Sequence, residues 1–239
     1  AGHLCAGWSL IENHNERIEA LESILSAVDM VMSNTSFDIG LSWLLDAQQL
    51  FKSLKFKEMY EQQRERDFRV SILSKLAFCA WHANKCDFAL QVIQDEMLPC
   101  RDLTNSERIE FLNWKALINT QLSRYGQSAA PACEALRLLG HPIELEYDME
   151  DVGRHVQRVI EMVEEKGGID GIMKLEECND PTCRKINSLF YDLVPMSYIT
   201  NNVSLFTMLS VFSVRGTLEH GLMPSSAEGI ALFGFVASS

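Results

Sequence analysis

Cys79, His82 and Cys86 form the one set of side chains whose types and spacing suggest a metal site. Cysteine and histidine are common zinc ligands, and spacings of three and four residues place side chains on one face of a helix. The helix is expected to end near Asn84, which breaks that face, and a fourth ligand is missing nearby. We therefore predict no metal site and interpret the two thiols as buried core groups.

Nucleotide and phosphate chemistry finds no support in the sequence. The chain lacks GxxxxGK[ST], and Gly167, Gly168 and Gly171 follow a predicted helix, where they more plausibly stop it than cradle a phosphate. His155 stands beside Arg154 on an amphipathic helix, a setting typical of a solvated or packed imidazole. We predict no catalytic and no cofactor-binding residues, and we expect this chain neither to bind nor to hydrolyse ATP.

The 7 cysteines are odd in number, irregularly spaced and without a CxxC pair, which is typical of reduced core residues in a cytoplasmic protein. Cys178 and Cys183 flank a helix start and could form at most a weak redox pair. Residues 1–10 lack the basic start and apolar run of a signal peptide. The longest apolar stretch, 205–214, is half the length of a bilayer span. We predict a cytoplasmic location and no membrane partner.

Composition favours a helical protein. The chain has 239 residues, 47% hydrophobic and 23% charged, with only 6 Pro and 13 Gly. The net charge is −12, and the acidic residues are spread over several predicted helices. This balance argues against nucleic acid as a partner.

Apolar residues recur at helical spacing along most of the chain. The stripes predict helices at 18–31, 39–51, 67–83, 87–98, 148–166, 181–194 and 203–221. Residues 104–106 can cap another helix that runs to Tyr125, after which Gly126 turns the chain. Asp180 is a natural N-cap with Pro181 at the first helical position, and Pro195 is expected to end that helix. No strand is predicted.

Packing is the expected role of several large side chains. Three tryptophans, Trp43, Trp81 and Trp114, lie on apolar stripes. In the helix after Pro181, the side chains expected to face the next helix are Leu189, Phe190 and Leu193. Tyr198 is expected to anchor the turn that follows this helix. Residues 230–236 form an apolar pattern that would expose a sticky helix face if it remained unpaired. Solenoid ends normally carry polar caps, so we expect the chain to be a piece of a longer polypeptide.

A helical hairpin occurs twice, about 39 residues apart. Aligning 73–86 with 112–125 places Ala77 over Ala116. Such a period predicts antiparallel helix pairs stacked as an α-solenoid, which offers a wall for binding rather than a closed catalytic pocket. Small residues are expected where helices approach closely; these are Ala77, Ala83, Ala89, Ala116 and Ala129.

Three segments carry a family resemblance. Residues 124–142, which include RYG and EALRLLGHP, resemble the "RY-x-x-A…EALRLLG-x-x-[LI]P" segment in the tetratricopeptide-like region of predicted STAND-type signalling ATPases. Residues 179–201 resemble the family's "[MT]-DP…LLP-x-AY-x-x-N" stretch, and 218–227 resemble "x-x-x-HG-x-[ST]-x-x-[ST]A". Pro131 departs from the family preference for a helix former.

The resemblance implies a domain order and a function. Residues 1–13 would be the tail of a preceding domain, 14–140 tetratricopeptide-like helix pairs, and 141–239 a further helical region that continues beyond the chain. The segment would be a non-catalytic scaffold or sensor of a multidomain histidine kinase, serine-threonine kinase or cyclase, with another protein or its own neighbouring domains as partners. A free-standing tetratricopeptide adaptor is the alternative. A helical enzyme would need facing carboxylate motifs, which the sequence does not show.

Overall fold

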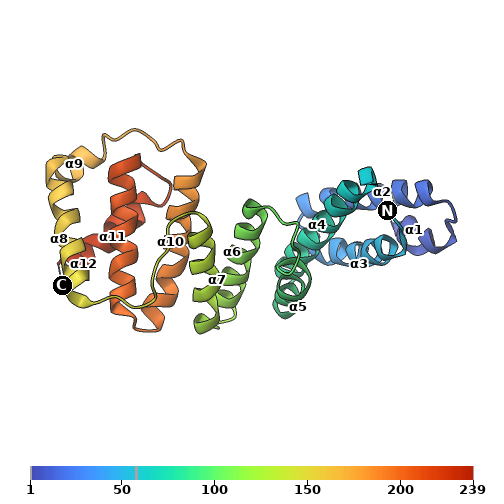
Figure 1. Ribbon diagram of the computed structural model, residues 1–239, viewed down its shortest axis with the longest axis horizontal. Coiled ribbons are helices and arrows are strands. Elements are labelled where there is room, and N and C mark those ends of the chain that lie inside the picture. The colour runs from blue at the N-terminus through green and yellow to red at the C-terminus, as the bar shows by residue number, and fades with distance from the viewer. Residues whose placement is uncertain (1, 57–58, 239) are drawn as a thin grey trace. The chain divides into compact units, whose positions relative to one another are not determined.

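The computed structural model describes residues 2–56 and 59–238, and these residues form an all-α protein (Figure 1). This confirms the predicted class. Within the described residues, extended pairing is limited to one isolated bridge between Glu177 and Leu222. No helix of the described part is long and apolar enough to cross a membrane.

The chain divides into two compact units, Ala1–Thr104 and Asn105–Ser239. This boundary differs from the one predicted at 140, because the helix pair after residue 104 packs against α10 (Pro181–Ile199). The first helix of the chain packs against α2 and α3, so the start of the chain belongs to the first unit.

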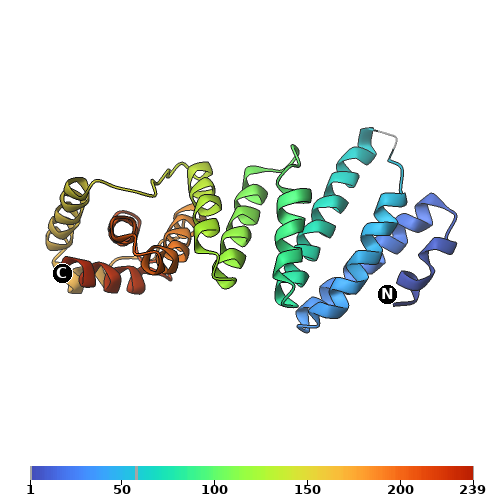
Figure 2. The same cartoon turned by 90° about the horizontal axis from the view of Figure 1, so that it is seen from below.

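The first unit is built from consecutive helices that pack on one another (Figure 2). They are α1 (Gly2–Gly7), η1 (Trp8–Leu10), α2 (His14–Ser33), α3 (Phe37–Ser53), α4 (Met59–His82), α5 (Cys86–Gln91) and the π-helical turn η2 (Val92–Met97). Asn13 caps α2, since its side chain accepts hydrogen bonds from the backbone N–H groups of Asn15 and Glu16. Leu21, Ile24 and Leu44 are fully buried between the helices.

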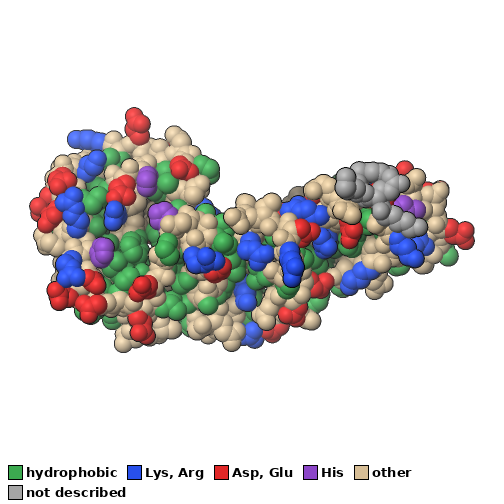
Figure 3. Space-filling view, viewed as in Figure 1, with side chains coloured by type: hydrophobic (Ala, Val, Ile, Leu, Met, Phe, Trp, Pro, Cys, Tyr) green, Lys and Arg blue, Asp and Glu red, His purple; other side chains and the backbone are tan. Residues whose placement is uncertain are grey.

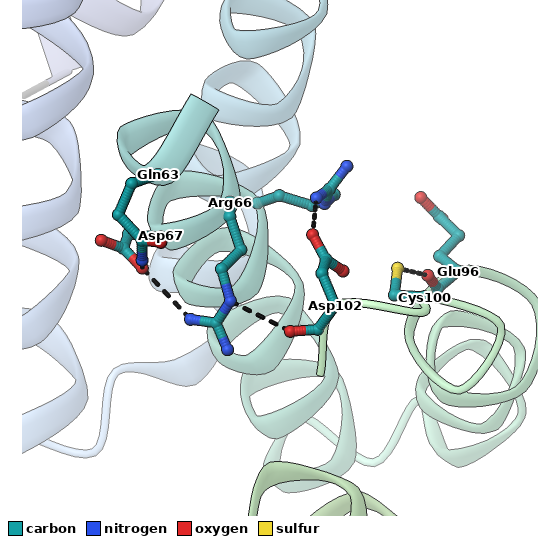
Figure 4. Close-up of polar contacts among 7 residues, drawn as sticks. Gln63, Arg66, Asp67, Glu96, Cys100 and Asp102 are labelled. Carbon is teal, nitrogen blue, oxygen red and sulfur yellow. Dashed lines mark hydrogen bonds and ion pairs between the residues drawn. The ribbon is translucent and has the colours of Figure 1, made fainter. Parts of the chain in front are cut away.

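Charged side chains fix the last segment of the first unit to α4 (Figure 4). Arg66 donates from Nε to the carbonyl oxygen of Asp102 at 3.1 Å, and the guanidinium of Arg69 pairs with the Asp102 carboxylate. On the same segment, the Cys100 thiol donates to the carbonyl oxygen of Glu96 at 3.0 Å. Asp102, near the end of the first unit, is therefore bonded to α4 through Arg66 and Arg69.

Four helices end in the same way. Thr35, Asn84, Ser123 and Asn201 have φ between 54° and 59°, in the left-handed region. In each case the next residue donates its N–H at 2.8 Å to the carbonyl oxygen five residues earlier; these pairs are 36 with 31, 85 with 80, 124 with 119 and 202 with 197. The bond satisfies a carbonyl that the helix end would otherwise leave without a partner.

Two of these turns support the 39-residue repeat. Asn84 and Ser123 are separated by that offset and carry the same hydrogen bonds. Ala77 and Ala116 are both buried, as the alignment requires. The expected turn at Gly126 is wrong: the helix ends at Gln121, the chain turns at 122–124, and Gly126 is already helical. Ala89 and Ala129 are also buried, whereas Ala83 is half-buried.

The second unit surrounds α11. Its helices are α6 (Asn105–Gln121), α7 (Tyr125–Leu138), α8 (Met149–Glu165), α9 (Gly168–Ile172), α10, α11 (Val203–His220) and α12 (Ser226–Ala237). Helix α11 packs against α8, α10 and α12, while α10 also packs against α7 and α6 (Figure 1). One core cluster joins α8, α9, α11 and α12 through Val159, Ile172, Val211, Val214, Leu218 and Phe233.

Helix α10 begins as predicted but continues further. Asp180 caps it by accepting the N–H of Thr182 at 2.7 Å. The helix then passes through Pro195 to Ile199, so the predicted end at 194 is wrong. Proline removes one hydrogen bond from the helix ladder. Met196 and Ser197 beyond it are buried, and this packing extends the helix past the proline.

Gly221 fixes the segment before α10 to the end of α11. Its φ is 101°, and an added Cβ would overlap the carbonyl oxygen of Glu176. The close approach allows Leu222 to donate its N–H to Glu176 at 2.8 Å and to accept from the N–H of Cys178 at 2.8 Å. Glycine is needed here because other residues rarely adopt this conformation.

Candidate functional site: an apolar groove

The three residues with metal-ligand spacing do not form a metal site. Cys79 is fully buried on α4, and burial raises the pKa of its thiol to about 11. The ring of His82 packs on Phe37 and Phe78, with centroids 4.8 and 4.2 Å apart. Among the described residues, no group of three or more His, Cys, Asp or Glu side chains is arranged to hold a metal ion.

The second cysteine pair, Cys178 and Cys183, is not joined by a disulfide bond in the structure. Cys178 and Cys183 are both free thiols. Cys183 donates from Sγ to the carboxylate of Asp180 at 3.4 Å. Desolvation and this carboxylate raise the pKa of Cys183 to about 11, so the thiol is protonated at neutral pH and is a poor nucleophile. His155 lies exposed on α8.

An open groove of about 800 Å³ lies on the surface of the second unit. We call it the α8–α12 groove. Its lining comes from α8, α10, α11, α12 and the turn before α11, and consists of Met149, Val152, Gly153, Val156, Ser197, Tyr198, Ile199, Asn201, Asn202, Val203, Phe206, Thr207, Phe235 and Val236. The residues given for this lining include no Asp, Glu, Lys, Arg or His.

Large hydrophobic side chains are exposed on the groove. Met149 is 59% exposed, Tyr198 70% and Phe235 64%, and Ile199 and Val203 are also more than half exposed. Exposed apolar side chains that gather around a concavity commonly mark an interaction surface, whereas scattered ones need no explanation. The groove therefore differs from the remaining surface by its concentration of such side chains.

The turn between α10 and α11 opens the groove. Asn201 takes the left-handed conformation that ends α10, and α11 begins two residues later. Tyr198 was expected to anchor this turn; its carbonyl oxygen accepts the N–H of Asn201 at 3.1 Å, while its side chain is 70% exposed. Its ring lies 6.0 Å from the ring of Phe206 and is otherwise turned to solvent. Gly153, which also lines the groove, faces open space, because an added Cβ there would contact nothing within 4 Å.

Hydrogen bonds hold the start of α8 beside the groove. Asn202 donates from Nδ2 to the carbonyl oxygen of Leu145 at 2.6 Å, and its Oδ1 accepts the N–H of Leu205 at 3.1 Å. Tyr147 donates its backbone N–H to the hydroxyl of Ser204 at 3.3 Å. The segment before α8 is thereby tied to the start of α11.

This segment is strongly acidic. Five carboxylates fall within residues 144–151: Glu144, Glu146, Asp148, Glu150 and Asp151. Asp148 caps α8 through the backbone N–H groups of its first turn. Arg154 pairs with Glu150, 2.8 Å away, and with Asp151, all on the exposed surface. One end of the groove therefore combines apolar side chains with a net negative rim; acidic side chains gather around this end of α8 in Figure 3.

No protein-family model matches the chain, and neither curated proteins nor solved structures show a significant match to it. The resemblance drawn from the sequence motifs thus has no independent support from relatives.

Sequence reasoning found one part of this groove. The apolar pattern at 230–236 indicated an exposed helix face, and Phe235 and Val236 on α12 do line the groove. The other walls were missed because they come from separate helices, and because α10 was expected to end before Tyr198. Met149, an exposed apolar residue between two acidic ones, was the available signal.

Proposed function

We propose that the chain is a non-catalytic interaction module whose α8–α12 groove binds an amphipathic helix with basic flanks. The observation that carries the proposal is the combination of an uncharged, solvent-open groove with a carboxylate-rich rim at one end. Helices commonly bind such grooves through apolar side chains spaced by three or four residues.

The apolar part of the groove supplies the binding energy. Tyr198, Phe206 and Phe235 offer aromatic surface, and large aromatic side chains dominate many interfaces. The partner helix covers exposed faces of α10 and α12 and removes their apolar surface from water. This removal is the main favourable term in association.

The acidic rim selects the charge of the partner. Of the five carboxylates at 144–151, two share Arg154, which leaves net negative charge beside Met149. Lysine or arginine residues flanking the apolar face of the partner complement this charge. Electrostatic complementarity of this kind mainly raises the association rate and excludes acidic partners.

The resemblance to the tetratricopeptide-like region of STAND-type signalling ATPases supplies a context for this proposal. In that context the chain is a scaffold or sensor segment, and the helix belongs to another protein or to a neighbouring domain of the same polypeptide. The recurrent helix end at Asn84 and Ser123 supports a repeat architecture of this kind.

A synthetic peptide of about 18 residues tests the groove, since a helix rises ~1.5 Å per residue. The peptide carries leucines at helical spacing and lysines at both flanks, and fluorescence anisotropy measures its binding. Tyr198→Ala is expected to weaken binding by roughly tenfold or more, as truncation of a central aromatic contact does. Because Tyr198 is mainly exposed, the fold is retained.

Ile169→Ala is the matched control. Ile169 is also a large exposed side chain of the second unit, 64% accessible, but it does not line the groove. A scrambled peptide of equal charge and a version with glutamate flanks complete the set. Equal effects of the two alanine variants, or equal binding of the scrambled peptide, would rule out helix docking. A dimer in sedimentation that Tyr198→Ala dissociates would show instead that a second copy occupies the groove.

A further inference from the structure

A second concavity of the second unit, of about 230 Å³, lies between α10 and α11. Its lining is Cys183, Ile186, Asn187 and Phe190 from α10; Phe212, Arg215, Gly216, Glu219 and His220 from α11; and His141 and Met223 from the adjoining segments. It shares no residue with the α8–α12 groove. Its volume suits a molecule of about one ring, since pockets for drug-sized ligands start at roughly 300 Å³.

Asn187 makes this pocket unusual. The residue is only 2% exposed, yet its Oδ1 has no hydrogen-bond partner within the structure. Its Nδ2 donates only to the thioether sulfur of Met223, at 3.3 Å. A sulfur atom is a weak acceptor, and a buried amide oxygen without a donor carries a desolvation penalty of roughly 1–3 kcal/mol. Asn187 is thus a lining residue of the pocket whose buried carboxamide leaves its oxygen without a hydrogen-bond partner.

The surroundings of Asn187 restrict what can satisfy it. Ile186, Phe190 and Met223 are buried, and the rings of Phe190 and Phe212 lie 5.5 Å apart at 30°. Such walls favour a flat, apolar body. The charged side chains Arg215 and Glu219 of the lining both come from α11. They form an exposed pair, in which Arg215 donates from Nε to Glu219 at 2.7 Å. Because Arg215 and Glu219 already pair with each other, an ionic ligand would lose its water without gaining a free counter-charge, so a ligand that reaches Asn187 needs a neutral polar edge.

We propose that this pocket binds a small planar molecule with a carboxamide or lactam edge, which pairs with the side chain of Asn187. The ligand N–H donates to Oδ1, and the ligand carbonyl accepts from Nδ2 in place of the Met223 sulfur. An edge with one donor and one acceptor matches the carboxamide in either of its two orientations. Gly216 leaves the space for the ring, since an added Cβ would meet only the methyl carbon of Met223, at 3.8 Å.

Benzamide is the probe, with benzoate and toluene as matched comparisons of similar size and shape. Protein-observed NMR titration of the full chain is expected to show saturable benzamide binding with a Kd on the order of millimolar, as suits so few atoms. Benzoate cannot donate to Oδ1, and toluene can pair with neither atom, so both are expected to bind at least roughly fivefold more weakly.

Asn187→Leu should weaken benzamide binding by about tenfold or more while preserving the fold, because it replaces an unsatisfied polar group by an apolar one of similar size. Asn119→Leu is the control. Asn119 on α6 is equally buried and also has a partnerless Oδ1, but it lies outside the pocket lining. Its substitution should leave benzamide binding unchanged.

Gly216→Leu provides an independent check, since it fills the pocket from α11 without touching Asn187's chemistry. It should abolish the binding of all three probes. Benzamide binding that survives Asn187→Leu or Gly216→Leu, equal affinities for benzamide and toluene, or no saturable binding would each overturn the proposal. The peptide test of the α8–α12 groove is separate, because it uses other residues and another probe.

Discussion

At the scale of single residues, Cys79 shows how burial changes chemistry. The thiol is fully buried on α4, and its sulfur would lie 3.1 Å from a Cβ atom added to Gly40. Burial is the largest cause of the rise of its pKa from 9.0 to about 11, and Asp29 adds to it while Lys75 opposes it. Two members of the set with metal-ligand spacing thus have packing roles. Cys79 packs between helices, and His82 packs on aromatic rings.

The raised pKa predicts a loss of stability at alkaline pH. In the unfolded chain Cys79 ionises near pH 9, whereas in the folded chain it stays protonated until about pH 11. Above pH 9 the unfolded state therefore binds fewer protons, and the free energy of unfolding falls. The stability is fully present below pH 9, and the loss by pH 10 is about 1.4 kcal/mol, since one pKa unit corresponds to ~1.4 kcal/mol.

Urea denaturation of the wild type and Cys79→Ala at pH 8 and pH 10 isolates this effect. The alanine variant lacks the ionisable group, so the stability difference between the two proteins should shift by about 1 kcal/mol in favour of the variant at pH 10. Other groups titrate equally in both proteins and cancel. A constant difference across this range would show that the thiol is accessible to solvent in the folded state.

At the scale of elements, the α11–α12 contact depends on a small residue. A Cβ added to Gly229 would overlap Oγ of Ser213 and lie 3.0 Å from its Cβ. Ser213 is buried on α11. Gly234 stands on the same helix, and a Cβ there would contact nothing within 4 Å. The two glycines thus form a matched pair on α12, one at a close approach and one in open space.

Gly229→Ala should destabilise the second unit by roughly 1–3 kcal/mol, because overpacking outweighs the gain in helix propensity. Gly234→Ala should stabilise it by roughly 0.5–1 kcal/mol, since only the propensity gain applies. Thermal unfolding followed by circular dichroism measures both. If both variants shift the midpoint in the same direction, the two helices do not approach as closely as described.

The helices were predictable where local chemistry decides them. The cap at Asp180 and the glycine stop at Gly167, whose φ is 89°, follow from side-chain and backbone preferences alone. The end at Pro195 was not predictable in this way, because buried residues beyond the proline extend α10. Likewise, the turn before α7 uses Ser123 in a left-handed conformation, whereas the sequence pattern indicated a turn at Gly126.

The candidate site was less accessible to sequence reasoning. Residues of the α8–α12 groove come from four helices and one turn, so their proximity depends on tertiary packing. Asn187 gave no signal either, because an asparagine inside an apolar helix does not reveal whether its amide has partners. Only the tertiary packing that brings Met223 and Phe212 beside Asn187 makes Asn187 a lining residue of a pocket.

At the scale of the whole molecule, the boundary at 104 has a physical basis in the second unit. Helix α10 packs against α7 and α6, so the helix pair from 105 to 138 covers part of its surface. Arg66 and Arg69 hold Asp102 within the first unit. The sequence instead indicated a change at 140, where the motif-bearing hairpin ends and an extended segment begins.

Two fragments distinguish these boundaries. Residues 105–239 contain α6 to α12 with the core around α11, and are expected to unfold cooperatively in urea. Trp114, the only tryptophan of this fragment, packs on Phe111 at 5.6 Å and reports the transition by fluorescence.

Residues 141–239 lack the pair α6–α7 and would expose the covered side of α10, including parts of its buried face. This fragment should have lower helicity per residue and a broader, less cooperative unfolding transition, because small units bury too little apolar surface. Because this fragment lacks Trp114, its unfolding is followed by circular dichroism and not by fluorescence. The longer fragment should also bind the lysine-flanked peptide as the full chain does, since the α8–α12 groove lies wholly within it. If 141–239 unfolds as cooperatively as 105–239, the helix pair is dispensable to the second unit, and the boundary indicated by the sequence at 140 is the physical one.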